Sequence, residues 1–142
     1  MECQRQGFAK ARLRAVALIT EIVERFDVIA VQEVRRDTTA LRRLVAELGS
    51  NWRFITSDVT EGDAGNGIRL TFLYDIDRVQ PSGLVGEVVL PETVDQSAKQ
   101  FARSPYAVSF RRGPAEFILT TLHVIWGSRT EDRIPEITAI AK

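Results

Sequence analysis

The sequence predicts an α/β (α+β) domain in which a mixed, mostly antiparallel sheet carries helices on one face. A helical pattern over residues 8–26 runs straight into a β-branched segment at residues 27–31, and a helix followed by a buried strand is typical of layered α/β folds. Later strands follow one another closely, and Arg112-Gly-Pro114 between two of them is a hairpin signal. The chain has 142 residues, 44% of them hydrophobic, so we expect residues 1–142 to form one domain.

The N-terminal third is predicted to be helix, strand and helix. Apolar residues recur near a helical period between Phe8 and Phe26. The run from Asp27 to Val31 resembles a strand buried on both faces. A second helix is expected after Asp37 or Thr38, either of which can cap it, and it should end at Gly49.

The remaining elements follow from β-rich runs and their breakers. Residues 61–67 contain three glycines and residues 92–100 are polar, so both segments are expected to be loops. Strands are predicted at 52–56, 68–74, 79–90, 106–111 and 116–124, followed by a helix at 130–142.

Overall charge argues against a general attraction to nucleic acid or to a membrane surface. The 19 basic and 19 acidic residues cancel, so any phosphate binding must be local. No stretch approaches the ~20 apolar residues of a membrane span, and we expect a soluble protein without a membrane partner. Cys3 is the only cysteine, which slightly favours a reducing compartment such as the cytoplasm.

Glu33 is the first candidate for chemistry. It follows the predicted buried strand, together with Gln32, and strand ends are where open α/β sheets usually place ligand groups. A carboxylate there is a suitable ligand for Mg²⁺. A glutamate at a strand exit is more commonly just solvated, so this position by itself leaves both interpretations open.

His123 is the second candidate. It is the only histidine and ends the apolar run from Phe117, and imidazole can transfer protons near neutral pH. A lone histidine is more often a hydrogen-bonded residue at the edge of a core. Arg69 and Arg103 each adjoin a predicted strand and could hold phosphate oxygens, with surface ion pairs as the more common alternative.

Four segments in this order resemble the endonuclease/exonuclease/phosphatase superfamily, in its deoxyribonuclease-like branch. They are Asp27-Val-Ile-Ala-Val-Gln-Glu-Val-Arg35, Gly67-Ile-Arg-Leu-Thr-Phe-Leu-Tyr-Asp75, Phe101-Ala-Arg-Ser-Pro105 and Phe117-Ile-Leu-Thr-Thr-Leu-His123. The resemblance implies the N-terminal part of a four-layer α/β/β/α sandwich and a metal-dependent phosphodiesterase, by descent a nuclease acting on DNA.

The resemblance also implies roles for individual residues. Glu33 matches the glutamate that holds the catalytic Mg²⁺, with Mn²⁺ or Ca²⁺ as alternative ions, and His123 matches a histidine that assists proton transfer. Arg103 matches an arginine that contacts phosphate, and Arg35 an arginine that reaches into the DNA minor groove. Relatives commonly carry a glutamate, paired with the histidine, at the position of Ile68, so the partner of His123 is an open question.

Three further family segments are not found in the sequence: a first strand that ends in an asparagine ligand, a Gly-Asp-x-Asn segment and a Ser-Asp-His segment. We therefore expect an incomplete domain with little or no hydrolysis, since the residues of such a site act as a unit. A lipid phosphodiesterase or phosphatase of the same superfamily is one alternative. Another is a binding module without catalysis that forms a homodimer through an uncovered apolar sheet face.

Overall fold

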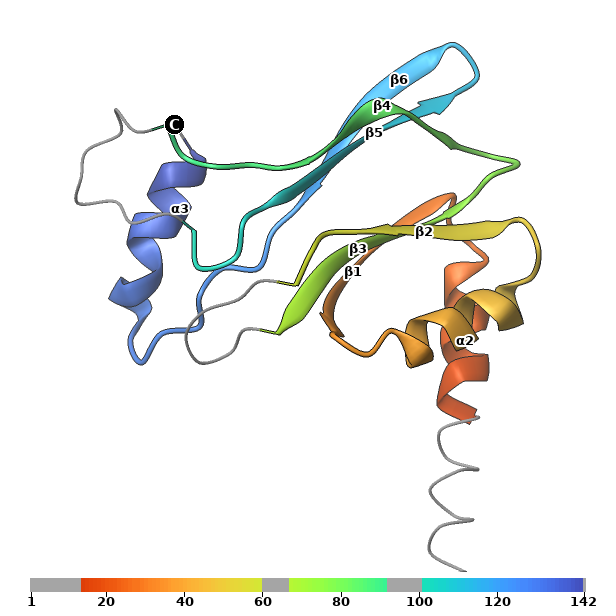
Figure 1. Ribbon diagram of the computed structural model, residues 1–142, viewed down its shortest axis with the longest axis horizontal. Coiled ribbons are helices and arrows are strands. Elements are labelled where there is room, and N and C mark those ends of the chain that lie inside the picture. The colour runs from red at the N-terminus through yellow and green to blue at the C-terminus, as the bar shows by residue number, and fades with distance from the viewer. Residues whose placement is uncertain (1–13, 60–66, 92–100, 142) are drawn as a thin grey trace, which may run out of the picture.

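Two three-stranded sheets form the centre of the molecule. The computed structural model describes residues 14–59, 67–91 and 101–141, and every strand pairing in it is antiparallel. Sheet A has the order β1-β3-β2 and sheet B the order β4-β5-β6 (Figure 1). The strands are β1 (Val28–Arg35), β2 (Trp52–Thr56), β3 (Ile68–Asp75), β4 (Gln80–Glu87), β5 (Tyr106–Arg112) and β6 (Ala115–Thr121).

Helices cover one face of sheet A. The helix at residues 14–23 and α2 (Thr39–Leu48) lie below the sheet in Figure 1. Val23 and Leu41 of these helices are buried in one cluster with Trp52 and Leu73 of the sheet. This apolar contact is the reason the helical pattern predicted from the sequence becomes a stable layer.

The opposite face of sheet A packs on sheet B. Phe72 of β3 contacts Tyr106 and Phe110 of β5, with ring centroids 6.2 and 5.8 Å apart, and all three side chains are buried. Fully burying a side chain of this size stabilises the fold by about 2–3 kcal/mol. The interface between the sheets is therefore the main core.

The third helical region lies at one end of the sheets. It consists of η1 (Thr130–Arg133) and α3 (Ile134–Ile140), which stand beside the two sheets in Figure 1. In the part of the chain that the structure describes, no helix covers the outer face of sheet B. The layers are thus helix, sheet and sheet, and the predicted fold class, part of an α/β/β/α sandwich, is confirmed.

Most predicted elements lie close to their observed bounds. The chief differences are at element ends: pairing in β6 stops at Thr121 and in β4 at Glu87, so the predicted strands were too long. The predicted loops at 61–66 and 92–100, and the helical pattern before residue 14, lie outside the described residues. None of the described helices is long and apolar enough to cross a membrane.

Candidate functional site

A β-bulge in β1 places Glu33. Val31 pairs with Thr71 and Val34 with Arg69, so three steps along β1 match two along β3. Glu33 lies inside the bulge with a φ of 58° and is the only non-glycine residue with positive φ among the described residues. This left-handed conformation costs a residue with a side chain about 1–2 kcal/mol. Bulges commonly redirect a side chain next to a functional site.

Gln32 connects the bulge to the second sheet. Its side-chain Nε2 donates hydrogen bonds to the Leu122 carbonyl at 2.6 Å and to the Thr121 hydroxyl at 3.4 Å. The end of β6 is thereby held against β1, although the two strands belong to different sheets. Glu33 and His123 therefore do not leave neighbouring strands of one sheet but meet where the two sheets approach each other.

Glu33 and His123 lie next to each other. Glu33 Oε1 is 3.7 Å from His123 Nε2. The Glu33 side chain is 72% exposed and that of His123 is 24% exposed, so the carboxylate is accessible while the imidazole is largely enclosed. His123 lies two residues beyond the end of β6, in the segment that Gln32 holds. The two residues can contact one bound group.

Both residues line a cleft of about 810 Å³. Its wall carries three arginines and two carboxylates, so its local charge is positive although the whole chain is neutral. A cleft of this charge suits an anionic ligand such as a phosphodiester. The lining residues are Glu33, Arg35, Arg36, Asp37, Gly67, Ile68, Arg103, His123 and Trp126.

Of the three predicted phosphate-binding arginines, the structure brings two to the cleft. Arg35 and Arg103 line it, whereas Arg69 does not. Arg69 Nη1 donates to the Ser57 carbonyl at 2.7 Å and lies 3.8 Å from a carboxylate oxygen of Asp58. Side chains alternate along a strand, so Ile68 lines the cleft and Arg69 is directed elsewhere.

Ile68 occupies the part of the cleft where the family resemblance would place a glutamate. Within the described residues, His123 Nδ1 is buried and has no hydrogen-bond partner. A carboxylate on this nitrogen usually fixes the tautomer and orientation of a catalytic histidine. In this chain the position carries the apolar side chain of Ile68, which cannot accept a hydrogen bond from the imidazole.

Asp37 shapes another edge of the cleft by beginning α2. Its Oδ1 accepts hydrogen bonds from the Thr39 backbone N–H at 2.9 Å and from the Thr39 hydroxyl at 2.6 Å. The hydroxyl bond, with a smaller contribution from the backbone bond, lowers the pKa of Asp37 below its ordinary value of 3.8. The sequence left Asp37 and Thr38 as alternative caps. Thr38 is the N-cap residue but makes no side-chain cap hydrogen bond, and Asp37 accepts the hydrogen bonds from Thr39 instead.

Glu136 was not predicted, yet it holds two segments of the cleft wall together. Its Oε1 accepts from the Ala102 N–H at 2.6 Å and its Oε2 from the Ile125 N–H at 2.7 Å. Arg103 and Trp126 directly follow these two residues and both line the cleft. A glutamate on a short amphipathic helix gives no sequence signal for this contact.

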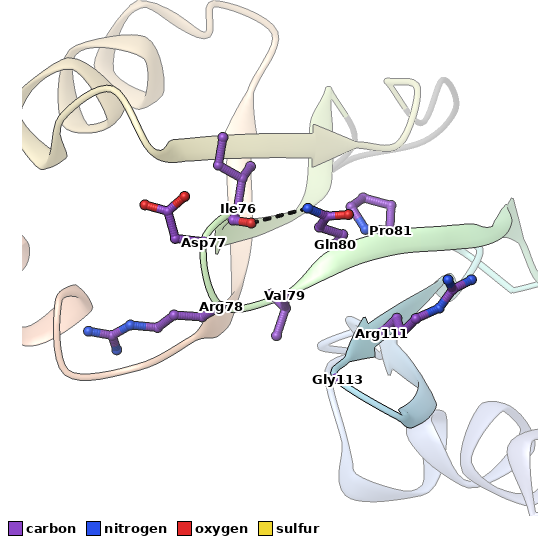
Figure 2. Close-up of a pocket in the computed structure, with 8 residues that line it drawn as sticks. All are labelled: Ile76, Asp77, Arg78, Val79, Gln80, Pro81, Arg111 and Gly113. Carbon is purple, nitrogen blue, oxygen red and sulfur yellow. Dashed lines mark hydrogen bonds between the residues drawn. The ribbon is translucent and has the colours of Figure 1, made fainter.

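A second hollow, of about 330 Å³, lies at the turn between β3 and β4. Its charged side chains do not converge: those of Asp77 and Arg78 point away from that of Arg111, and Gln80 donates to its neighbour Ile76 (Figure 2). Arg78 also pairs with Asp27 and Asp75. This hollow offers no assembled set of chemical groups.

A divalent metal could bind in the first cleft only with few protein ligands. The residues that the structure describes hold no group of three or more His, Cys, Asp or Glu suited to a metal. Mg²⁺ nevertheless often takes one or two protein carboxylates and completes its shell with water and substrate phosphate. The exposed Glu33 carboxylate fits that mode of binding.

Known proteins are similar to this chain in sequence and in fold. No protein-family model matches the chain. A protein from Thioalkalivibrio sp. (strain K90mix) named deoxyribonuclease is 30% identical over 129 residues, which cover 87% of this chain and 34% of that protein. The chain thus spans about a third of the length of this curated relative.

Solved structures agree on the fold. ANGEL2, a 2′,3′-cyclic phosphatase, superimposes with a TM-score of 0.64 at 11% identity, covering 88% of this chain and 34% of ANGEL2. Its complex with adenosine-2′,3′-vanadate superimposes with a TM-score of 0.66 at 14% identity, covering 89% of this chain and 35% of that chain. A conserved protein of unknown function from Enterococcus faecalis V583 superimposes with a TM-score of 0.60 at 19% identity, covering 91% of this chain and 50% of that chain.

Proposed function

We propose that this chain contributes to a Mg²⁺-dependent hydrolase of nucleic-acid phosphodiesters, with DNA as the substrate. The observation that carries the proposal is the approach of Glu33 and His123 to 3.7 Å in a cleft lined by arginines. The relative named deoxyribonuclease and the fold shared with a 2′,3′-cyclic phosphatase support a substrate that contains a phosphodiester.

The residues of the chain would divide the work as follows. Arg35 and Arg103 bind phosphate oxygens through charge-assisted hydrogen bonds, and Glu33 holds the ion. When bound, Mg²⁺ supplies polarisation of the phosphodiester. His123 Nε2 faces the same space and exchanges a proton with a phosphate oxygen or an attacking water.

Hydrolysis by these 142 residues alone should be slow or absent. The described residues hold no group of three or more acids, histidines or cysteines that could bind a metal, and catalytic groups that act together lose far more than their share when some are missing. Ion binding is therefore a sharper first test than turnover.

The test uses Mn²⁺ as a paramagnetic probe in nuclear magnetic resonance. We expect Mn²⁺ to broaden the backbone signals of Glu33 and Val34 and the ring signals of His123, and Mg²⁺ to compete. Glu33→Gln should abolish this broadening, while the exposed Glu47→Gln on α2 should leave it unchanged. Broadening that survives Glu33→Gln would remove Glu33 from ion binding and overturn the proposal.

A cleavage assay complements the ion-binding test. Any Mg²⁺-dependent cleavage of single-stranded or duplex DNA by the full chain should fall in Glu33→Ala and in His123→Ala. Equal rates in the wild type and Glu33→Ala would show that the cleavage does not arise at this site.

A second candidate is assembly through the outer face of sheet B. Ile118 and Leu84 are 58% and 46% exposed and line a shallow hollow with Ser109 and Phe117. Apolar groups exposed on a sheet face favour contact with another surface, and a second copy is the homodimer expected above. Light scattering tests this: a stable monomer at micromolar concentration, unchanged by Ile118→Glu, would exclude the homodimer.

A further inference from the structure

Trp126 is an exposed aromatic side chain at the rim of the cleft. It is 80% exposed, more than any other large hydrophobic side chain that the structure describes, and it lines the same cleft as Glu33 and His123. Burial of an indole strongly stabilises a fold, so an indole left in solvent contributes little to the core. Its position beside the candidate site needs another explanation.

The ring is held in place although it is exposed. The Arg133 guanidinium lies 4.6 Å from the centre of the indole, and Arg133 Nε donates to the Trp126 carbonyl at 2.7 Å. One residue thus fixes both the backbone and one side of the ring. With 80% of the residue still accessible, the rest of the indole remains open to a ligand.

The turn after Trp126 is fixed as well. Asp132 Oδ2 accepts from the N–H groups of Ser128 and Arg129 at 2.7 and 2.9 Å. Gly127 has a φ of 66°, and a Cβ at this position would approach Asp132 Cβ to 2.5 Å. Only glycine fits this turn. On the other side of Trp126, the backbone N–H of Ile125 donates a hydrogen bond to Glu136. The segment is therefore ordered on both sides of the tryptophan.

We propose that Trp126 is a stacking platform for an unpaired nucleobase of single-stranded nucleic acid. This inference rests on the proposed function and deepens it by naming the form of the substrate. A base in a duplex is covered on both faces by its neighbours, whereas an unpaired base can place one face on an indole. Arg35 and Arg103 in the same cleft would bind the adjoining phosphates, which carry no base information.

The experiment compares two probes that carry the same phosphate charge. One is a short single-stranded DNA oligonucleotide, and the other is an abasic oligonucleotide of equal length, both bound to the full chain in the presence of EDTA. Stacking on one aromatic side chain typically strengthens binding about tenfold or more. We therefore expect the abasic probe to bind the wild type about tenfold more weakly.

Tryptophan fluorescence locates the contact. The chain has two tryptophans: Trp52 is 3% exposed and Trp126 is 80% exposed, so their emissions differ in wavelength. Stacking should quench the long-wavelength emission of Trp126 when the base-containing probe binds and leave that of Trp52 unchanged.

Variants separate stacking from folding. Trp126→Ala should reduce affinity for the base-containing probe to that for the abasic probe, and Trp126→Phe should retain most of it. Phe26→Ala removes an aromatic side chain that is 51% exposed and does not line the cleft, and it should change neither affinity. Circular dichroism of each variant checks that the fold is intact.

The outcomes distinguish this inference from the proposed function. Equal binding of both probes by the wild type, or base-dependent binding that survives Trp126→Ala, would overturn the platform while leaving phosphate binding in the cleft intact. Failure of both probes to bind would count against both proposals. Broadening by Mn²⁺ that persists in Glu33→Gln would count against the proposed function alone.

Discussion

The side-chain amide of Gln32 donates a 2.6 Å hydrogen bond to the Leu122 carbonyl, and this contact joins the two sheets beside the candidate site. Gln32 directly precedes Glu33, and Leu122 directly precedes His123. The same hydrogen bond that closes the sandwich at this end therefore sets the spacing between the two candidate catalytic side chains.

Removal of this contact should loosen the site. We expect Gln32→Ala to lower the free energy of unfolding by about 1 kcal/mol, the usual contribution of one hydrogen bond. The ring signals of His123 should shift or broaden. Gln80→Ala, which removes a glutamine contact with Ile76 far from the cleft, is the matched control. Unchanged His123 signals in Gln32→Ala would show that another contact sets the spacing.

The backbone at Glu33 predicts an opposition between stability and function. Glycine adopts positive φ without the steric cost that a Cβ imposes, so Glu33→Gly should be more stable than Glu33→Ala by about 1 kcal/mol in urea unfolding. Both variants should lose ion binding. Equal stabilities would indicate that the left-handed conformation at this residue carries no cost.

A carboxylate at position 68 should orient His123. Ile68 lines the cleft and His123 Nδ1 has no hydrogen-bond partner within the described residues, so Ile68→Glu could accept from this nitrogen. We expect the ¹⁵N signal of Nδ1 to move toward the protonated form and any cleavage rate to rise severalfold. Ile68→Leu, which keeps the position apolar, should reproduce neither change.

Glu136 should act on the cleft from outside it. Glutamine keeps one acceptor but presents its NH₂ group to the second N–H, so Glu136→Gln breaks either the Ala102 or the Ile125 contact. A hydrogen bond to a charged group contributes about 1.5–3 kcal/mol, and the loss in stability should approach that range. Amide signals of Ala102 and Ile125 should shift, whereas the exposed Glu131→Gln on η1 should leave them in place.

Acid should weaken the start of α2 through Asp37. The pKa of Asp37 is lowered in the folded protein from its ordinary value of 3.8, so its contribution to stability is complete above that value and is lost as the pH falls through the folded pKa. Asp37→Asn keeps a capping oxygen that does not titrate. As the pH falls below 3.8, the wild type should lose stability relative to Asp37→Asn, as measured by urea unfolding. A constant difference would contradict the prediction.

The order of elements could be predicted from the sequence because it depends on local patterns. The helix that ends at Gly49 and the hairpin at residues 112–115 follow from capping, glycine and proline signals that act within a few residues. The end of β6 could not be predicted in this way. Apolar residues continue to Val124, and only the position of the partner residue Tyr106 ends the pairing at Thr121.

The candidate site was predictable in part for the same reason. Glu33 and His123 were identified from residue type and family resemblance, and the structure brings them together. Which way the Arg69 side chain points depends on the register of strand pairing. The role of Gln32 depends on a hydrogen bond to a residue 90 positions away in the sequence. Neither can be predicted from local sequence patterns. The exposure of Trp126 is also a property of the folded chain, although an aromatic residue before a glycine in a polar segment was a signal that could have been used.

The extra residue in β1 has a consequence for changes in chain length. Because of the bulge, Val31 and Val34 both pack toward the helical layer, and Arg35 pairs with Ile68 on the cleft side. In a regular strand Val31 and Arg35 would share a face. Deletion of Glu33 would match two steps of β1 with two of β3, so Val34 and Arg35 would keep their present faces in a regular strand. Insertion of a second extra residue before Val34 would instead exchange the faces of Val34 and Arg35, so this stretch should tolerate a shortening by one residue better than a lengthening, at the cost of the bulged position itself.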